Sequence, residues 1–257
     1  MQDIRLPLQI LAEAAQLLGC ESTNSDDISK AVLRVSNGRK HFFAGLGKIG
    51  MYPLNPHFAA ALASDKAWAY QVLSQAGFKI PKGDYFFLTN DWLEYRPANK
   101  DMDAARRFAA SVGYPLFVKP NDSSSGMLAE LLFDDEKLKQ HLLQIAQISK
   151  VAVLQEYINL PEYRIFVVDD HVEFMYQRTK PTVTGDGKRT IRELITAHNS
   201  LIPIKSHQVQ FESPSICAEL TNRKLTLDTV LPLGDKIEVA AHANLASGGS
   251  IVGLTYQ

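Results

Sequence analysis

The feature that most restricts the fold is a short apolar strand that ends in a lysine and runs directly into a polar loop. The apolar run is Tyr114–Pro120, its lysine is Lys119, and the loop Asn121–Gly126 holds three consecutive serines and a closing glycine. An ammonium group beside hydroxyls and backbone N–H donors suits the phosphates of a nucleotide. A helix-length spacer then leads to the carboxylates of Glu156 and Glu162. A cation, a flexible loop and two later carboxylates, in this order, can hold a nucleotide without a P-loop.

Size and charge limit the class of protein. The chain has 257 residues, 46% of them hydrophobic, and a formal net charge of −1. Such a chain can build two or three small lobes with buried cores. A charge this close to zero provides no overall field that recruits nucleic acid or an anionic membrane. We therefore expect no nucleic-acid and no membrane partner, and the sequence leaves a homo-oligomer open.

Cysteine usage and hydropathy bear on the compartment. Cys20 and Cys217 are far apart and have no CxxC partner, which suits neither a disulfide framework nor a zinc site. We expect Cys217 to be buried rather than to act as a nucleophile. The N-terminus has no long apolar segment, and no stretch reaches the about 20 apolar residues of a membrane span. The expectation is a cytoplasmic protein.

Alternating helix and strand signals predict an α+β fold with mainly antiparallel sheets. Asn37-Gly38 predicts a hairpin turn, and Thr190 with Glu193 predicts a capping box. Helices are expected over 6–18, from a Ser64 cap to 76, and over 102–112, 133–148 and 190–199. Strands are expected over 31–36, 39–44, 116–119, 151–158, 163–168, 172–176, 224–230 and 236–241.

A competing motif lies upstream. Gly45–Gly50 fits the pattern GxGxxG and follows a predicted strand. The dinucleotide fingerprint needs a helix that begins inside the motif, whereas Pro53 and Pro56 follow here. A dinucleotide enzyme is therefore the weaker hypothesis, and it would require NAD binding that survives the loss of the Lys119 side chain. His242 has no partner for a nucleophilic triad and is expected to be a structural histidine.

From about Ser64 to its end, the chain resembles the ATP-grasp superfamily of carboxylate–amine ligases. Ser64–Lys66, with the Leu and Ala-Gly that follow, is similar to the opening segment of the family. Lys119 resembles its nucleotide-binding lysine, and Asn121–Gly126 its mobile phosphate loop. Gln155–Ile158 resembles the hinge whose backbone reads adenine, and Glu162 the acid that meets the ribose.

Within the superfamily, Arg178–Leu194 and Asn244–Gly249 are most similar to cyanophycin synthetase and to the ATP-grasp half of bifunctional glutathione synthetases. Two features depart from the family: serines replace glycines in the phosphate loop, and Lys180 stands where a small residue is common. The metal-binding Asp and Glu-x-Asn of the family follow the Asn244–Gly249 segment, and no such triplet occurs before Gln257. The resemblance thus predicts an incomplete C-terminal lobe, with Mg²⁺ ligands from outside this chain.

The implied fold is the ATP-grasp fold, in which two α+β lobes with mainly antiparallel sheets clamp a nucleotide. A small N-terminal α/β segment would precede it. The implied boundaries are 1–62 for the segment before the ATP-grasp fold, 63–155 for the small lobe with the phosphate loop, and 156–257 for a partial large lobe.

The implied chemistry uses ATP and Mg²⁺ to convert a carboxylate into an acyl phosphate, which an amine then attacks. The substrates would be amino acids or peptides, with arginine, aspartate, cysteine, glycine and short peptides all open. The alternative is a nucleotide-binding module that is catalytically incomplete by itself. The implied nucleotide-binding residues are Lys66, Lys119, Ser123, Ser125, Gly126, Gln155, Glu156, Tyr157, Ile158 and Glu162. Arg164 and Arg178 are implied as catalytic, and Ser247, Gly248 and Gly249 as substrate-binding.

Overall fold

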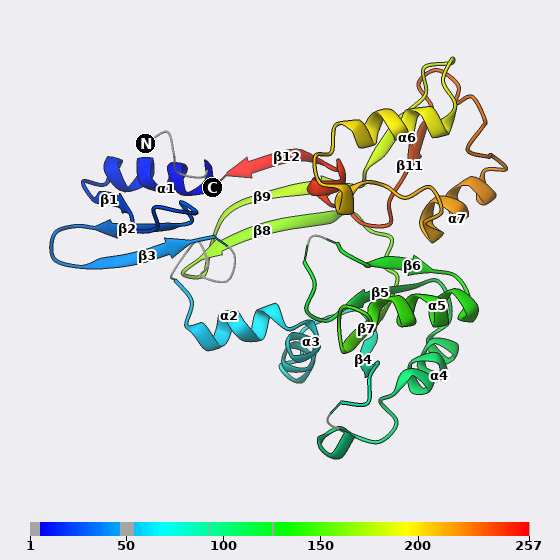
Figure 1. Cartoon of the computed structure of the whole chain (residues 1–257), viewed down its shortest axis with the longest axis horizontal. Helices are drawn as coiled ribbons and strands as arrows, with labels where there is room; N and C mark the ends of the chain where they lie inside the picture. The colour runs from blue at the N-terminus through cyan, green and yellow to red at the C-terminus, as the bar shows by residue number, and fades with distance from the viewer. Residues whose placement is uncertain (1–5, 47–53, 92, 125, 257) are drawn as a thin grey trace. The chain divides into compact units, whose positions relative to one another are not determined.

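The computed structural model describes residues 6–46, 54–91, 93–124 and 126–256. They fall into two compact units, Met1–Ser64 and Asp65–Gln257. Each unit is described by itself, with its elements labelled in Figure 1. Most of the GxGxxG motif at Gly45–Gly50 lies outside the described residues. The predicted boundary between residues 155 and 156 stays a prediction.

The first unit packs one helix against a small antiparallel sheet. The predicted helix and hairpin are confirmed, and the buried side chains include Leu8, Ala12 and Leu33. Gly19 has a positive φ of 71° after the helix end, a conformation that suits glycine. The elements are α1 (Leu6–Leu17), β1 (Glu21–Asn24), β2 (Val32–Ser36), β3 (His41–Gly45) and α2 (His57–Ser64).

The largest sheet of the second unit has the strand order β4-β7-β5-β6 and is antiparallel throughout. Its strands are β4 (Gly83–Phe87), β5 (Leu116–Pro120), β6 (Glu130–Leu132) and β7 (Val151–Glu156). Helices α4 (Met102–Val112) and α5 (Asp135–Ile145) pack on it and share its buried core. Leu116 and Val118 point into this core, so the alternation of a strand places Phe117 and Lys119 on the opposite face.

Two smaller sheets complete the second unit. The sheet β12-β9-β8 consists of β8 (Glu162–Val168), β9 (His171–Thr179) and β12 (Ser250–Tyr256). β10 (Thr182–Thr184) pairs with β11 (Lys236–Glu238). Helices α6 (Ile191–Ser200) and α7 (Pro214–Asn222) share a buried cluster with this pair. The capping box of Thr190 and Glu193 is formed as predicted.

Several local predictions are wrong. Asp65, not Ser64, caps α3 (Lys66–Gln75), because its carboxylate accepts a hydrogen bond from the Trp68 N–H. The predicted strand at residues 224–230 is a turn, apart from a single bridge between Thr190 and Val230. Cys217, which we expected to be buried, is exposed on α7. Helices α2 and α7 and strands β1, β4, β6, β10 and β12 were not predicted.

Both sheets of three strands and the sheet of four strands are antiparallel, and helices pack beside them, so the α+β class is confirmed. None of the helices in the described ranges is long and apolar enough to cross a bilayer.

Candidate functional site

A cavity of 730 Å³ lies where the chain leaves β7 and enters β8, and we call it the first cavity. Its wall brings together segments that are far apart in the sequence. Six of the predicted site residues line it: Gln155, Glu156, Tyr157, Ile158, Glu162 and Arg178. The rest of its lining is Pro81, Phe117, Asn159–Pro161, Gln177, Thr179, Lys180, Glu238 and Ala241–Ala243.

Lys119 reaches this cavity through Gln155. Its ammonium group donates a hydrogen bond of 2.7 Å to Oε1 of Gln155, whose side chain lines the cavity. The pairing of β5 with β7 sets this contact, because Phe117 lies opposite Gln155 and Lys119 lies two residues further on the same face. Burial, together with the nearby charge of Lys66, lowers the pKa of Lys119 to about 8. An anionic ligand would therefore find an ammonium that lacks a carboxylate partner among the described residues.

Lys66 holds the start of the phosphate loop. Its ammonium donates to the backbone oxygens of Asn121 (2.8 Å) and Ser123 (2.5 Å). The buried Asn121 side chain completes the attachment by accepting from the Ala67 N–H (2.7 Å) and donating to the Asp65 carboxylate (2.7 Å). These contacts tie the loop to the N-terminus of α3, so Lys66 positions the loop beside Lys119.

Ion pairs order the floor of the first cavity. Arg178 pairs with Glu162 across β9 and β8, where the two residues are in register. Lys180 pairs with Glu238 at 2.8 Å and donates to the Tyr157 hydroxyl at 3.0 Å. The Nε of Arg178 is buried and has no hydrogen-bond partner within the described ranges. This unsatisfied donor belongs to a residue that lines the cavity, and an anionic ligand would supply its missing partner.

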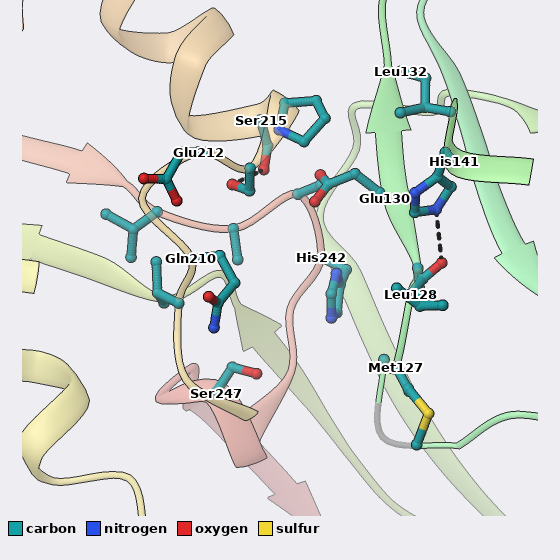
Figure 2. Close-up of a pocket in the computed structure, with 18 of the residues that line it drawn as sticks. Met127, Leu128, Glu130, Leu132, His141, Gln210, Glu212, Ser215, His242 and Ser247 are labelled. Atoms are coloured by element: carbon teal, nitrogen blue, oxygen red, sulfur yellow. Dashed lines mark hydrogen bonds between the residues drawn. The ribbon is translucent and has the colours of Figure 1, made fainter. Parts of the chain in front are cut away.

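The remaining predicted residues lie elsewhere. Arg164 is exposed on β8 and is not among the described residues that line the first cavity. The Ser123 hydroxyl donates to the backbone oxygen of Met127 at 3.3 Å, and Ser125 lies outside the described residues. Gly126 and Ser247 line a neighbouring second cavity, part of which is drawn in Figure 2.

Comparison with known proteins finds two kinds of relatives. The glutathione biosynthesis bifunctional protein GshAB of Streptococcus thermophilus is 30% identical over 203 residues, which are 75% of this chain and 25% of that protein. The cyanophycin synthetase of Crocosphaera subtropica is 25% identical over 213 residues, 77% of this chain and 22% of that protein. Both kinds are those that the motifs of Arg178–Leu194 and Asn244–Gly249 resemble. The comparisons therefore agree with the resemblance of this chain to the ATP-grasp superfamily.

Other matches cover most of this chain but likewise only part of the matched protein. The GshAB protein of Desulfotalea psychrophila is 21% identical over 264 residues, 99% of this chain and 32% of that protein. The solved structure of a bifunctional glutathione synthetase from Pasteurella multocida covers 97% of this chain and 33% of that one, at 18% identity and a TM-score of 0.49. No family model matches. The chain thus spans about a quarter to a third of the length of the curated relatives described here.

Three residues of this site were not predicted from the sequence. Lys180 was noted only as a departure from the family, yet it lines the first cavity and pairs with Glu238. Glu238 itself carries no motif, because only the pairing of β10 with β11 brings it near Lys180. His242 was expected to be a structural histidine, and it lines both cavities. The available signal was a histidine two residues before the Asn244–Gly249 segment.

The described acids of the candidate site do not form a metal centre by themselves. Within the ranges that the structure describes, no group of three or more His, Cys, Asp or Glu side chains could hold a metal ion. Glu162 and Glu238 already pair with Arg178 and Lys180. The residues present therefore do not fit a protein-held Mg²⁺, and no step below depends on that ion.

Gly248 offers a test of the packing at the predicted substrate end. It has a φ of 89°, and an added Cβ would lie 2.3 Å from a ring carbon of His198, whose Nε2 is 2.9 Å from the Ser247 oxygen. We expect Gly248→Ala to lower the free energy of unfolding by about 1–3 kcal/mol more than Gly234→Ala. Gly234 is the matched control, because its φ of 84° is similar and no atom lies within 4 Å of its added Cβ. Urea unfolding measures both variants, and equal destabilisation would contradict this packing.

Proposed function

We propose that this protein is an ATP-dependent, ADP-forming carboxylate–amine ligase that acts on amino acids or peptides. The observation that carries the proposal is the buried ammonium of Lys119, which donates to Gln155 at the edge of the first cavity. The relatives are named for glutathione biosynthesis and cyanophycin synthesis. We propose that the first cavity performs the same kind of ligation for which those longer proteins are named.

ATP would lie in the first cavity with its base against the segment that follows β7. The backbone of Glu156–Ile158 would frame the adenine, and Glu162 would accept from the ribose hydroxyls. Lys119 would bind the phosphate chain, while Lys66 holds the Asn121–Gly126 loop in position to cover it. The cavity volume of 730 Å³ is within the range of small-molecule sites.

In the reaction, an oxygen of the substrate carboxylate attacks the γ-phosphorus, and the bond from that phosphorus to ADP breaks. Negative charge moves onto the leaving ADP and the phosphoryl oxygens. Fixed cations in a partly buried site stabilise such charge strongly because little solvent must reorganise. Arg178 suits this role, since its Nε is buried without a partner among the described atoms. Arg164, exposed on β8, would have to move to share that role.

Magnesium remains a prediction of the family resemblance. Because the described acids do not form a metal site, Mg²⁺ would be bound by the nucleotide phosphates and by groups outside the described residues. The two ATP-grasp lobes at 63–155 and 156–257, the cytoplasmic location and the absence of nucleic-acid and membrane partners also stay predictions, and so does a homo-oligomer.

The direct test is ADP formation by the purified protein with ATP, magnesium and a mixture of amino acids. We expect ADP release that depends on the mixture and disappears when the mixture is omitted. ATP binding without any ADP release would instead support the second candidate, a nucleotide-binding module that needs a further component. That candidate is favoured because the described residues contain no cluster of acids that could hold a metal ion. Absence of ATP binding would contradict both.

ATP affinity should depend on pH through Lys119. Its pKa of about 8 in the free protein means that the ammonium predominates below pH 8 and the neutral amine above it. Only the ammonium attracts phosphates, so affinity is greatest below pH 8 and falls as the pH rises through that value. We expect roughly a tenfold loss between about pH 7 and 9, by the ratio of charged fractions. Nucleotide titration measures this, and Lys119→Met should remove the dependence in that window. An unchanged slope in the variant would contradict the assignment.

A further inference from the structure

The second cavity has a volume of 520 Å³ and lies on the α5 side of the sheet edge formed by β6. Its wall includes Leu128 and Glu130 before and on β6, His141 on α5, Gln210 and Ser215 around the start of α7, and His242 with Ser247 from the last loop (Figure 2). It shares Ala241 and His242 with the first cavity. A group bound here would therefore adjoin the nucleotide cavity through one imidazole ring.

Glu130 is the main charged group in the wall of the second cavity. Burial raises the pKa of its carboxyl, while hydrogen bonds from the Leu131 N–H and from Ser215 oppose that rise. No Lys, Arg or His side chain forms an ion pair with it in the part of the chain that the structure describes. Burying a carboxylate without a counter-ion is costly. An ammonium group of a ligand would supply the missing charge.

His242 occupies the boundary between the two cavities. Neither of its ring nitrogens has a hydrogen-bond partner among the described residues, and both are buried. Its ring meets Phe117 edge-on at 6.2 Å between centroids. It also packs against the phosphate loop, because a Cβ added to Gly126 would lie 2.3 Å from its Nε2. Burial and the charge of Arg178 lower the pKa of His242, so the ring is neutral at pH 7 and has one nitrogen free to accept a proton.

We propose that the second cavity binds a free amino acid as the amine co-substrate, with Glu130 as the counter-ion of its ammonium group and His242 as the acceptor of its proton. This inference rests on the proposed ligase function and adds to it the location and chemistry of the amine. The cavity volume suits a small molecule. Glu212 and Lys137, both exposed, also line the cavity, with opposite charges.

The step balances as follows. The ammonium group gives one proton to a ring nitrogen of His242 and becomes a neutral amine. The amine nitrogen attacks the carbonyl carbon of the acyl phosphate, so a C–N bond forms and the C–O bond to phosphate breaks. The oxygen of the leaving phosphate takes the electron pair, and the second amine proton leaves with it as hydrogen phosphate. No oxidant or reductant takes part, and proton transfer by a positioned histidine is worth about a hundredfold or more in rate.

A binding experiment tests the site without turnover. Each of the twenty amino acids is titrated singly into the full chain, without ATP, and binding is followed by ligand-observed NMR. We expect at least one to bind at millimolar concentration, with affinity at least tenfold lower in Glu130→Gln. N-acetylation of that amino acid, which removes its ammonium, should weaken binding to the same degree. Glu219→Gln is the control, because Glu219 pairs with Arg223 and does not line the described part of either cavity.

A second variant guards against loss of folding at position 130. Gln210 is exposed in its loop, so Gln210→Trp should fill the second cavity from the solvent side without disturbing a core. It should abolish amino-acid binding and leave ATP binding within twofold. Binding of no amino acid, or binding that Glu130→Gln and Gln210→Trp both leave intact, would overturn the site. If the parent protein does not bind ATP, the proposed function itself is refuted.

The role of His242 is tested by comparing two nucleophiles that attack the acyl phosphate, an amino acid and hydroxylamine. Hydroxylamine is largely neutral near pH 7, so it can attack an acyl phosphate without first losing a proton to a base, and the proton that its nitrogen then loses leaves with the phosphate. We expect His242→Gln to lose at least a hundredfold in ADP formation with an amino-acid acceptor and to keep hydroxamate formation within twofold. His171→Gln, at an exposed turn, should change neither rate. Equal loss with both acceptors, or loss with neither, would overturn the proton-accepting role, and absence of both products in the parent protein would overturn it together with the ligase function.

Discussion

Replacing Lys119 by alanine should weaken ATP binding by about ten- to a hundredfold, which corresponds to about 1.5–3 kcal/mol for a lost charge-assisted phosphate contact. The side chain is largely removed from solvent and its ammonium donates to Gln155. Its pKa of about 8 reflects burial and the charge of Lys66, both of which a bound phosphate would offset. Isothermal titration at pH 7 measures the change.

The control for this prediction is Lys139→Ala. Lys139 lies exposed on α5 and does not line the described part of either cavity, so its loss should leave ATP affinity within twofold. Removing the buried charge of Lys119 should not unfold the protein, because burial already disfavours that charge. Thermal unfolding of both variants checks this. A Lys119→Ala protein that is folded and binds ATP as the parent does would show that the nucleotide site lies elsewhere.

The second large effect concerns turnover. Arg178→Ala should lower the rate of ADP formation by about a hundred- to a thousandfold, the range seen when one fixed donor to developing charge is removed. Arg178 pairs with Glu162 and retains a buried Nε without a partner among the described atoms. The guanidinium can therefore bind a phosphoryl oxygen without giving up its ion pair. Arg178→Lys should recover only part of the rate, since an ammonium lacks the planar set of donors.

Arg107→Ala is the matched control for Arg178. Arg107 is exposed on α4, and its contact with Asp101 is long, at 4.0 Å. We expect its rate to stay within twofold of the parent, as measured by coupled detection of ADP. ATP affinity in Arg178→Ala should fall less than the rate does, because the contact strengthens as charge develops. A variant with normal turnover and weak ATP binding would assign Arg178 to binding alone.

Much of the candidate site could be predicted from local sequence. The apolar runs around Lys119 and Gln155 each predicted a strand, and the structure shows that these strands, β5 and β7, pair with one another. The helix cap at Thr190 could also be predicted, because a cap needs only residues within the first turn. These features are local in the chain or follow from strand alternation.

What could not be predicted depends on long-range packing. Leu225 and Leu227 alternate like strand residues, yet they pack against a buried cluster from a turn. Glu130 belongs to no motif. Only the folded chain brings Ser215, at the start of α7, close enough to form a hydrogen bond with Glu130 in the wall of the second cavity. Pairing of β10 with β11 brings Glu238 to Lys180. In each case the decisive neighbour lies tens of residues away, beyond any local pattern.

We expect the adenine of bound ATP to lie against the segment that follows β7. An ATP analogue with an azide on the adenine ring should, on illumination, label the peptide that contains Tyr157 and Ile158, and excess ATP should prevent the labelling. Peptide mapping by mass spectrometry reads the site directly. ATP-protected labelling that falls only outside Gln155–Glu162 would contradict the account.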